Sequence, residues 1–197
     1  MENNDLKNHT MALMEKAARA RKNAAANASP ETVRQWEKTG AIPAKVRRNI
    51  DVDHRSVARL TENMAKNPGT YVFLGPYRTG KSTLAASIYT RWTKGHAYWT
   101  DTYTMIREIR ETFNSKTVWK TPRHSLLVID EYEKQHATDW VAAEIDRTLR
   151  WRHDEEKTTI VISNLEPMEL EQNLGGSMLA RIQEINGWYA FENPWWK

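Results

Sequence analysis

The stretch Gly75-Pro-Tyr-Arg-Thr-Gly-Lys-Ser82 decides the fold, because it matches the pattern GxxxxGK[ST] at every fixed position. An apolar run, Tyr71–Leu74, precedes it, and a stretch rich in helix-forming residues follows it. The glycines let the backbone curl so that successive N–H groups point inward, and the positive end of the following helix faces the same space. The stretch therefore predicts a phosphate-binding loop between a strand and a helix.

Within this loop, Lys81 is placed to reach the β- and γ-phosphates, and the Ser82 hydroxyl is placed to ligate Mg²⁺. We expect ATP and Mg²⁺ as the bound cofactors. The residues predicted to bind the nucleotide are Gly75, Pro76, Tyr77, Arg78, Thr79, Gly80, Lys81, Ser82 and Thr83.

A second stretch, Leu126-Leu-Val-Ile-Asp130-Glu131, supplies the carboxylates that such a loop lacks. Its apolar run predicts a strand buried on both faces that presents Asp130 at its carboxyl end. There Asp130 can hold Mg²⁺ beside Ser82, and Glu131 can orient and polarise an attacking water. The alternative is a buried strand that ends in a solvated acidic turn. The adjacent acidic pair favours a Mg²⁺-dependent ATPase over a small-molecule kinase, which needs a second substrate pocket and no such base.

Two further polar residues are candidates for the catalytic set that contains Lys81 and Glu131. Asn164 ends another apolar run and can hydrogen-bond the γ-phosphate or the attacking water, although an Asn there is also a common turn or cap residue. Arg181 lies on an expected short helix and can stabilise transition-state charge in a neighbouring subunit, unless it is simply solvated.

Short apolar runs alternate with longer amphipathic stretches from Tyr71 onward, which is typical of an α/β fold with a parallel sheet. The expected strands are Tyr71–Leu74, His96–Thr100, Ser125–Ile129, Thr159–Ser163 and Trp188–Glu192. The expected helices span about 81–94, 102–113, 138–152 and 175–184.

Composition and charge limit the class of protein. The chain has 197 residues and no cysteine, which excludes disulfides, thiolate zinc sites and a cysteine nucleophile. No apolar run is long enough to span a bilayer, so we expect a cytoplasmic protein with no membrane partner. The first fifty residues carry ten Lys or Arg against five Asp or Glu. This basic segment, with helices expected at 5–26 and from Ser29 to Lys38, suits an acidic partner such as nucleic acid, or is a solvated helical face.

Together these elements resemble the AAA+ ATPases of the branch that contains the DnaC and DnaI helicase loaders and the transposition helper IstB. The resemblance runs from about Ala41 to Glu192 and is most specific in the two site motifs, in Thr158–Leu170 and in Leu174–Ile182. It implies a three-layer αβα P-loop NTPase fold with a five-stranded parallel sheet of order 5-1-4-3-2. It also makes Asn164 the sensor 1 residue and Arg181 the arginine finger.

The resemblance implies two domains and a role in replication. Residues 1–45 would be a helical, basic module that binds a partner or DNA, and 46–197 an ATPase domain without a full C-terminal lid. The function implied is a helicase loader that forms a homo-oligomer on ATP, with the arginine finger in trans. It would bind single-stranded DNA and deliver a replicative DnaB-type ring helicase at the initiation of DNA replication. The single-stranded DNA would contact the helix from Thr104 to Phe113 and the following Lys116, Trp119, Lys120 and Arg123.

Departures from the family pattern leave alternatives open. Tyr77 and Arg78 are bulkier than the residues usual inside the loop, and no arginine follows the last expected strand, so only Lys197 could act as sensor 2. The short N-terminal module suits a phage or mobile-element protein. The alternative functions are an IstB-like ATPase helper of DNA transposition and a DNA-binding regulator that does not hydrolyse its nucleotide.

Overall fold

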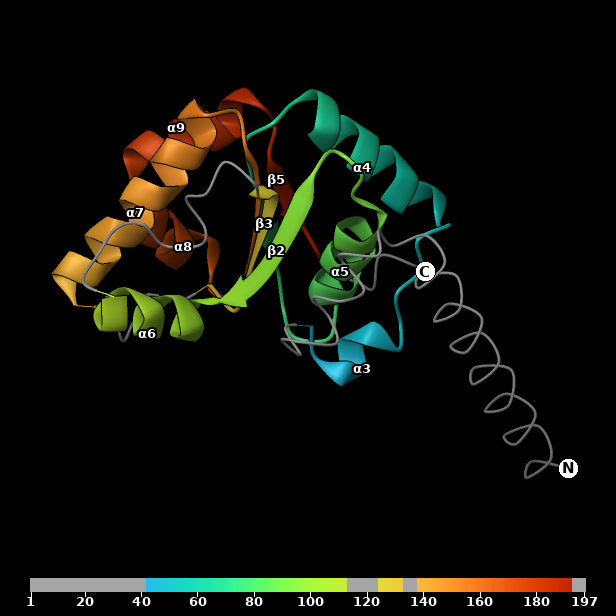
Figure 1. Ribbon diagram of the computed structural model, residues 1–197, viewed down its shortest axis with the longest axis horizontal. Helices are drawn as coiled ribbons and strands as arrows, with labels where there is room; N and C mark the ends of the chain where they lie inside the picture. Colours follow the sequence, from blue (N-terminus) through green and yellow to red (C-terminus); the bar gives the residue numbers. More distant parts are fainter. Residues whose placement is uncertain (1–41, 113–123, 133–137, 193–197) are drawn as a thin grey trace, which may run out of the picture.

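The structure is a computed structural model that describes residues 42–112, 124–132 and 138–192 (Figure 1). Its centre is a wholly parallel, five-stranded sheet of order β2-β3-β4-β1-β5. The strands are β1 (Thr70–Leu74), β2 (His96–Asp101), β3 (His124–Asp130), β4 (Thr158–Ser163) and β5 (Trp188–Ala190). Counted from the other edge, this is the predicted order 5-1-4-3-2, so the predicted fold class is confirmed.

The central strands β1, β3 and β4 are largely buried on both faces, because their residues alternate between two apolar cores. In β1, Tyr71 and Phe73 join one core, and Val72 and Leu74 join the other. Every residue of β1 and of β4 is buried. Since successive side chains of a strand point to opposite faces, a continuous apolar run is what a doubly covered strand requires.

Helices cover both faces and complete the three layers (Figure 1). On one face lie α3 (Ala44–Arg47), α4 (Arg55–Lys66) and α5 (Lys81–Arg91). On the other lie α6 (Thr102–Thr112), α7 (Asp139–Asp154), α8 (Pro167–Leu174) and α9 (Gly176–Glu184). None of the helices in the described part of the chain has the length and apolar character needed to cross a membrane.

The segment before α4 packs on α5. Ile42, Ile50 and Val52 are fully buried in the core on that face. The Asp51 N–H donates to the Ser87 hydroxyl at 3.1 Å, and Arg91 donates to the Val52 carbonyl at 3.1 Å. The described chain is therefore part of this core from Ile42 on.

The elements predicted within the described residues are present, with small differences at their ends. The helix expected to reach residue 94 ends at Arg91, because Trp92 has an extended backbone with ψ of 121°. The last strand, expected to reach Glu192, ends at Ala190, and the Phe191 N–H donates one further hydrogen bond to the Leu74 carbonyl at 2.8 Å. The predicted N-terminal helices, the positions Lys116, Trp119, Lys120 and Arg123, and Lys197 lie outside the described residues.

Candidate nucleotide-binding and hydrolysis site

The predicted phosphate loop connects β1 to α5 at the carboxyl edge of the sheet, and its backbone is unusual at three positions. Gly75 has φ of 143°, and a Cβ there would lie 2.2 Å from the Phe191 carbonyl oxygen. Gly80 is left-handed with φ of 88° and caps α5. Arg78 adopts φ of 65°, a conformation that costs a non-glycine residue free energy and is concentrated at functional sites. The two fixed glycines of the motif are therefore required by the shape of the loop.

Side chains inside the loop hold it in this shape. The Lys81 side chain is almost fully buried, and its Nζ donates to the carbonyls of Gly75 and Pro76 at 2.6 and 2.7 Å. The Thr79 hydroxyl donates to the same Pro76 carbonyl at 2.9 Å. Burial lowers the pKa of Lys81 from its ordinary value, and the nearby Asp130 charge partly offsets that effect. The buried ammonium group of Lys81 at the N-terminus of α5 therefore forms a site for an anion.

Ser82 and Asp130 meet, although they are far apart in the chain. The Ser82 hydroxyl donates to Oδ1 of Asp130 at 3.1 Å, and Asp130 is 8% exposed. Burial raises the pKa of Asp130 to about 6; the hydrogen bonds from Ser82 and the Glu131 N–H lower it, and the charges of Glu131 and Asp101 raise it further. The hydroxyl and carboxylate that were predicted to hold Mg²⁺ thus lie side by side.

Glu131 is exposed at the end of β3, where the backbone turns sharply. Its φ is 52°, and its N–H donates to Oδ1 of Asp130 at 3.1 Å. The next residue, Tyr132, donates its N–H to the Ile162 carbonyl of β4 at 2.7 Å. The Ser163 hydroxyl donates back to the Tyr132 carbonyl at 3.1 Å. These bonds fix the ends of β3 and β4 relative to each other. They therefore hold the turn that carries Glu131 in one position.

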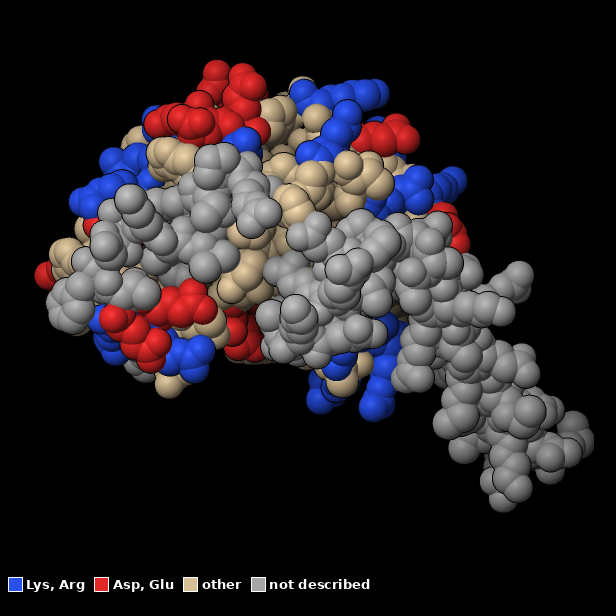
Figure 2. All heavy atoms as spheres, in the orientation of Figure 1, with Lys and Arg blue, Asp and Glu red and all other residues tan. Residues whose placement is uncertain are grey.

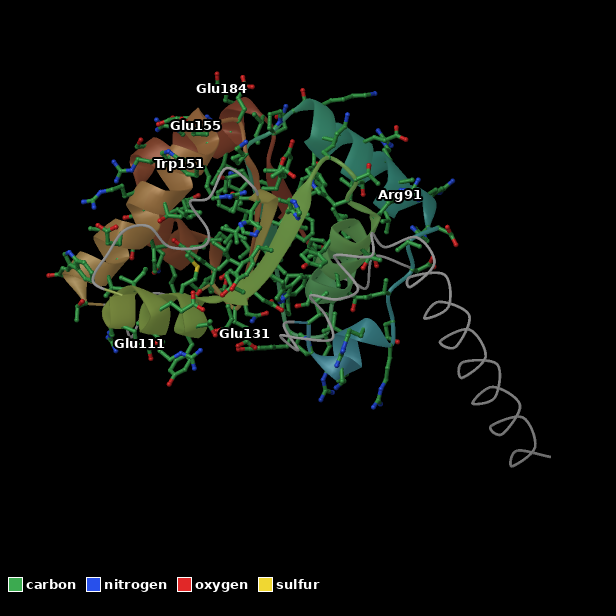
Figure 3. All side chains as sticks on the ribbon, viewed as in Figure 1. Arg91, Glu111, Glu131, Trp151, Glu155 and Glu184 are labelled. Carbon is green, nitrogen blue, oxygen red and sulfur yellow. The ribbon has the colours of Figure 1, made fainter. Side chains whose placement is uncertain are left out.

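A cavity of about 260 Å³ opens beside this turn, and we call it the edge cavity. Its polar lining comes from Asp101, Thr102, Glu131 and Asn164, and the rest from Tyr77, Tyr103 and Ile106. Figure 3 shows Glu131 at the lower edge of the molecule, beside the first turn of α6, and Figure 2 shows acidic atoms at the same edge. The structure therefore brings the predicted Glu131 and Asn164 into one cavity with the loop residue Tyr77.

Asp101 and Tyr103 belong to this cavity but were not predicted. Asp101 is the register neighbour of Asp130 on the adjacent strand. Its carboxylate accepts hydrogen bonds from the Thr104 N–H at 2.7 Å and the Thr104 hydroxyl at 2.9 Å. The signal in the sequence was weak: Asp101 directly follows the expected strand His96–Thr100, which is less apolar than the run before Asp130.

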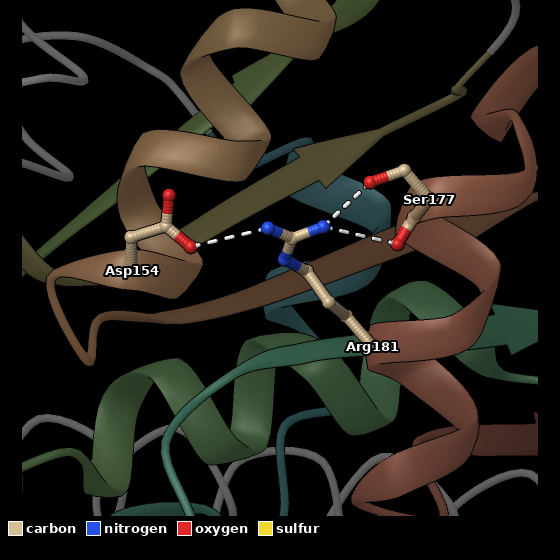
Figure 4. A network of polar contacts seen from close by, with 3 residues as sticks. All are labelled: Asp154, Ser177 and Arg181. Carbon is tan, nitrogen blue, oxygen red and sulfur yellow. Dashed lines mark hydrogen bonds and ion pairs between the residues drawn. The ribbon is translucent and has the colours of Figure 1, made fainter.

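Arg181 lies away from the edge cavity. Its guanidinium donates to the hydroxyl and carbonyl of Ser177 and to Asp154 at 3.4 Å (Figure 4). Glu155, next in the chain to Asp154, and Glu184 lie at the opposite end of the sheet from Glu131 (Figure 3). Arg181 is therefore not placed to act on the site of its own chain, and its predicted role in trans stays a prediction.

The residues present fit a magnesium–nucleotide complex. The glycine at position 75 leaves no room for a side chain, Lys81 provides a buried cation, and Ser82 with Asp130 provides the oxygen ligands that Mg²⁺ prefers. The other residues predicted to bind the nucleotide lie where expected, since Pro76 and Thr79 form the loop and Thr83 is buried in the first turn of α5.

Comparison with known proteins identifies the fold. No protein-family model matches the chain, and no curated protein matches it. Among solved structures, the DnaC helicase loader superimposes with a TM-score of 0.56 and 21% identity, over 70% of this chain and 86% of that one. Domain III of the Thermotoga maritima replication initiation protein DnaA gives a TM-score of 0.57 and 17% identity, over 72% of this chain and 64% of that one.

A DnaA initiator bound to AMPPCP and single-stranded DNA matches with a TM-score of 0.55 and 16% identity, over 70% of this chain. The match covers 46% of that initiator's length. At these identities the comparisons show a shared α/β fold. The resemblance drawn from the sequence is thus confirmed at the level of the fold.

Proposed function

We propose that the chain is a Mg²⁺-dependent ATPase that acts as a replicative helicase loader. The observation that carries the enzymatic part is the contact between Ser82 of the phosphate loop and Asp130 at the end of β3. It joins the phosphate loop to the acidic end of β3, with the buried Lys81 directly before Ser82 and Glu131 directly after Asp130. Its support at the level of the fold is the likeness to the DnaC loader and to DnaA.

Each residue of the site has a proposed role that follows from its position. Backbone N–H groups of the loop and Lys81 bind and orient the triphosphate, and Ser82 and Asp130 hold the metal. Magnesium, when bound, neutralises charge that develops on the phosphate oxygens. Glu131 accepts a hydrogen bond from the attacking water and turns the water oxygen towards the γ-phosphorus, while Asn164, directly after β4, holds that water in place. With Mg²⁺ bound, Asp130 would be held ionised, because the cation would stabilise the charge that burial disfavours.

The proposed DNA-binding element is the outer face of α6. Tyr103, Arg107 and Arg110 are exposed and lie on the same side of the helix, at spacings of four and three residues. An aromatic ring for base stacking and cations for the backbone are the materials of single-strand binding. The initiator that matches this fold was solved with single-stranded DNA. The predicted partner of residues 1–45 is a DnaB-type ring helicase, and the chain would form a homo-oligomer on ATP.

The first test separates hydrolysis from binding. Lys81→Ala should abolish binding of AMPPCP with Mg²⁺, whereas Glu131→Gln should bind it normally and lower turnover of ATP by at least about a hundredfold. Isothermal titration calorimetry measures the binding of AMPPCP, and phosphate release measures the turnover of ATP. Binding lost in Lys81→Ala, with phosphate release at background in both the wild type and Glu131→Gln, would instead support a regulator that does not hydrolyse its nucleotide.

The second test separates loading from transposition. Arg107→Ala with Arg110→Ala should weaken ATP-dependent binding to single-stranded DNA, and the salt dependence of the remaining binding should be shallower. Arg150→Ala, an exposed arginine on α7, is the matched control. Fluorescence anisotropy with single-stranded and duplex oligonucleotides provides the measurement. Binding to duplex DNA alone would rule out the loader and favour an IstB-like helper.

A further inference from the structure

The edge cavity is lined by polar side chains and by two tyrosine rings. Asp101, Glu131 and Asn164 supply carboxylates and an amide from three neighbouring strand ends. Tyr77 comes from the phosphate loop and Tyr103 from the first turn of α6. The cavity therefore connects the loop that would hold the triphosphate with the helix on the neighbouring edge of the sheet.

Both tyrosine rings are left in water, which is unusual in this molecule. Tyr77 is 73% exposed and Tyr103 is 72% exposed. Among the described residues, the other exposed large apolar side chains are Trp140 and Met168, and neither lines the edge cavity. Aromatic rings gain free energy from burial, about 25 cal/mol for each Å² of apolar surface, so two rings at one cavity mouth are poised to be covered.

ATP hydrolysis gives a reason for the two rings to be covered. The phosphoryl-transfer site needs one ordered water near Glu131 and Asn164, and stray water weakens every electrostatic contact inside it. Closure of loops around a bound substrate is the common way to exclude the rest. The strained backbone at Arg78, with φ of 65°, lies next to Tyr77 and marks a segment whose conformation is set by its surroundings.

We propose that Tyr77 and Tyr103 are positioning residues that close the mouth of the edge cavity over bound nucleotide and hold the attacking water against Glu131 and Asn164. This inference rests on the proposed ATPase. The rings act through the water and do not grip the nucleotide, because the loop binds phosphate through its backbone N–H groups. The rings work as a pair, so removal of either one opens the same mouth.

The first experiment measures the closure itself. Tyr77 and Tyr103 are replaced one at a time by fluorotyrosine, which keeps the aromatic ring, so the fluorine NMR signal of each ring can be followed in an otherwise wild-type chain. Addition of AMPPCP with Mg²⁺ should shift both signals and lower their sensitivity to a water-soluble paramagnetic agent, because the rings are covered when the mouth closes. Signals with unchanged position and unchanged accessibility at saturating AMPPCP would overturn the proposal.

The second experiment uses steady-state ATP hydrolysis without DNA, so that a role of Tyr103 in DNA stacking does not contribute. Tyr77→Ala and Tyr103→Ala should each lower kcat by at least about tenfold with KM unchanged, and the double variant should be no worse than either. Tyr77→Phe and Tyr103→Phe should restore the rate, since the ring is what closes the mouth. Met168→Ala, which removes an exposed apolar side chain on α8, should behave as wild type.

The outcomes separate the two proposals. A wild-type chain that binds AMPPCP but does not hydrolyse ATP would contradict the proposed function and this inference together. A wild-type chain that hydrolyses ATP, with Ala variants at the wild-type kcat or with additive losses in the double variant, would contradict the inference alone. A rise in KM at constant kcat would show that the rings bind nucleotide and would also overturn it.

Discussion

At Asp130, burial and two neighbouring carboxylates act together against ionisation of the side chain. The residue is 8% exposed. Asp101 is its neighbour on the adjacent strand, and Glu131 follows it in the chain. Burial raises its pKa to about 6, and the hydrogen bonds from Ser82 and from the Glu131 N–H only partly offset this. The ligand-free chain therefore carries a carboxylate that is costly to ionise, and a bound cation removes that cost.

Replacing this charge should stabilise the ligand-free protein. Because the folded pKa lies above the ordinary value of 3.8, protonation of Asp130 stabilises the fold at low pH, and this contribution is lost as the pH rises to about 6. Asp130→Asn keeps an oxygen that accepts from Ser82. At about pH 7.5 we expect the variant to gain about 2 kcal/mol in urea unfolding and to lose binding of Mg²⁺ with AMPPCP. A variant less stable than wild type at that pH would show that the burial argument is wrong.

The residues of the site differ in how far the sequence could predict them. Lys81, Ser82 and Asp130 could be placed because each has a fixed position relative to a strand or helix end. Asp101 could not, because its capping of α6 through Thr104 is a sufficient local reason for an Asp after a strand. Only the pairing of β2 with β3 shows that it also faces Asp130.

Among the elements, the strands were predictable, and three of the described helices, α3, α4 and α8, were not. A doubly buried strand gives a continuous apolar run that few other structures produce. By contrast, α8 has eight residues and begins with Pro167. A sequence that is so short and starts with proline indicates a turn as strongly as a helix. Its reciprocal cap between Glu166 and Glu169 was the feature to look for. For α4, the long polar outer face of Arg55, Arg59 and Lys66 obscures an inner face that is buried.

The contact of α7 with the sheet depends on a buried arginine. Arg152 is fully buried and donates to the Thr159 hydroxyl and to the carbonyls of Thr158 and His124, at 2.9, 2.8 and 3.0 Å. It thereby joins the end of α7 to the first residues of β3 and β4. Burial lowers its pKa to about 9, so the guanidinium is still charged at neutral pH.

Removing this arginine should destabilise the whole sheet. Arg152→Ala leaves the two carbonyls and the hydroxyl without a donor that water cannot easily replace, and it opens a cavity. We expect a loss of about 3 kcal/mol in urea unfolding. Arg150→Ala, on the exposed side of the same helix, should cost less than about 0.5 kcal/mol. Equal losses in the two variants would mean that helix propensity explains the effect and that the buried contacts add nothing.

At the scale of the whole molecule, the site and Arg181 lie at opposite ends of the sheet. The ion pair of Arg181 with Asp154 joins side chains that are 29% and 60% exposed, so it is worth about 0–1 kcal/mol and is easily given up. One chain cannot bring this arginine to its own Glu131 in the described conformation. A head-to-tail assembly can bring it to the site of the next chain, because such an interface pairs two different surfaces.

Mixing two inactive variants tests that arrangement. Arg181→Ala should keep nucleotide binding and lower DNA-stimulated hydrolysis on the order of a thousandfold, the size of a lost arginine finger. Mixed with Lys81→Ala subunits, it should regain part of the activity, because hybrid interfaces join an intact phosphate loop to an intact Arg181. Glu131→Gln mixed with Lys81→Ala should regain none, since both changes damage the same site. Failure of the first mixture to exceed the second would show that Arg181 does not act across a subunit boundary.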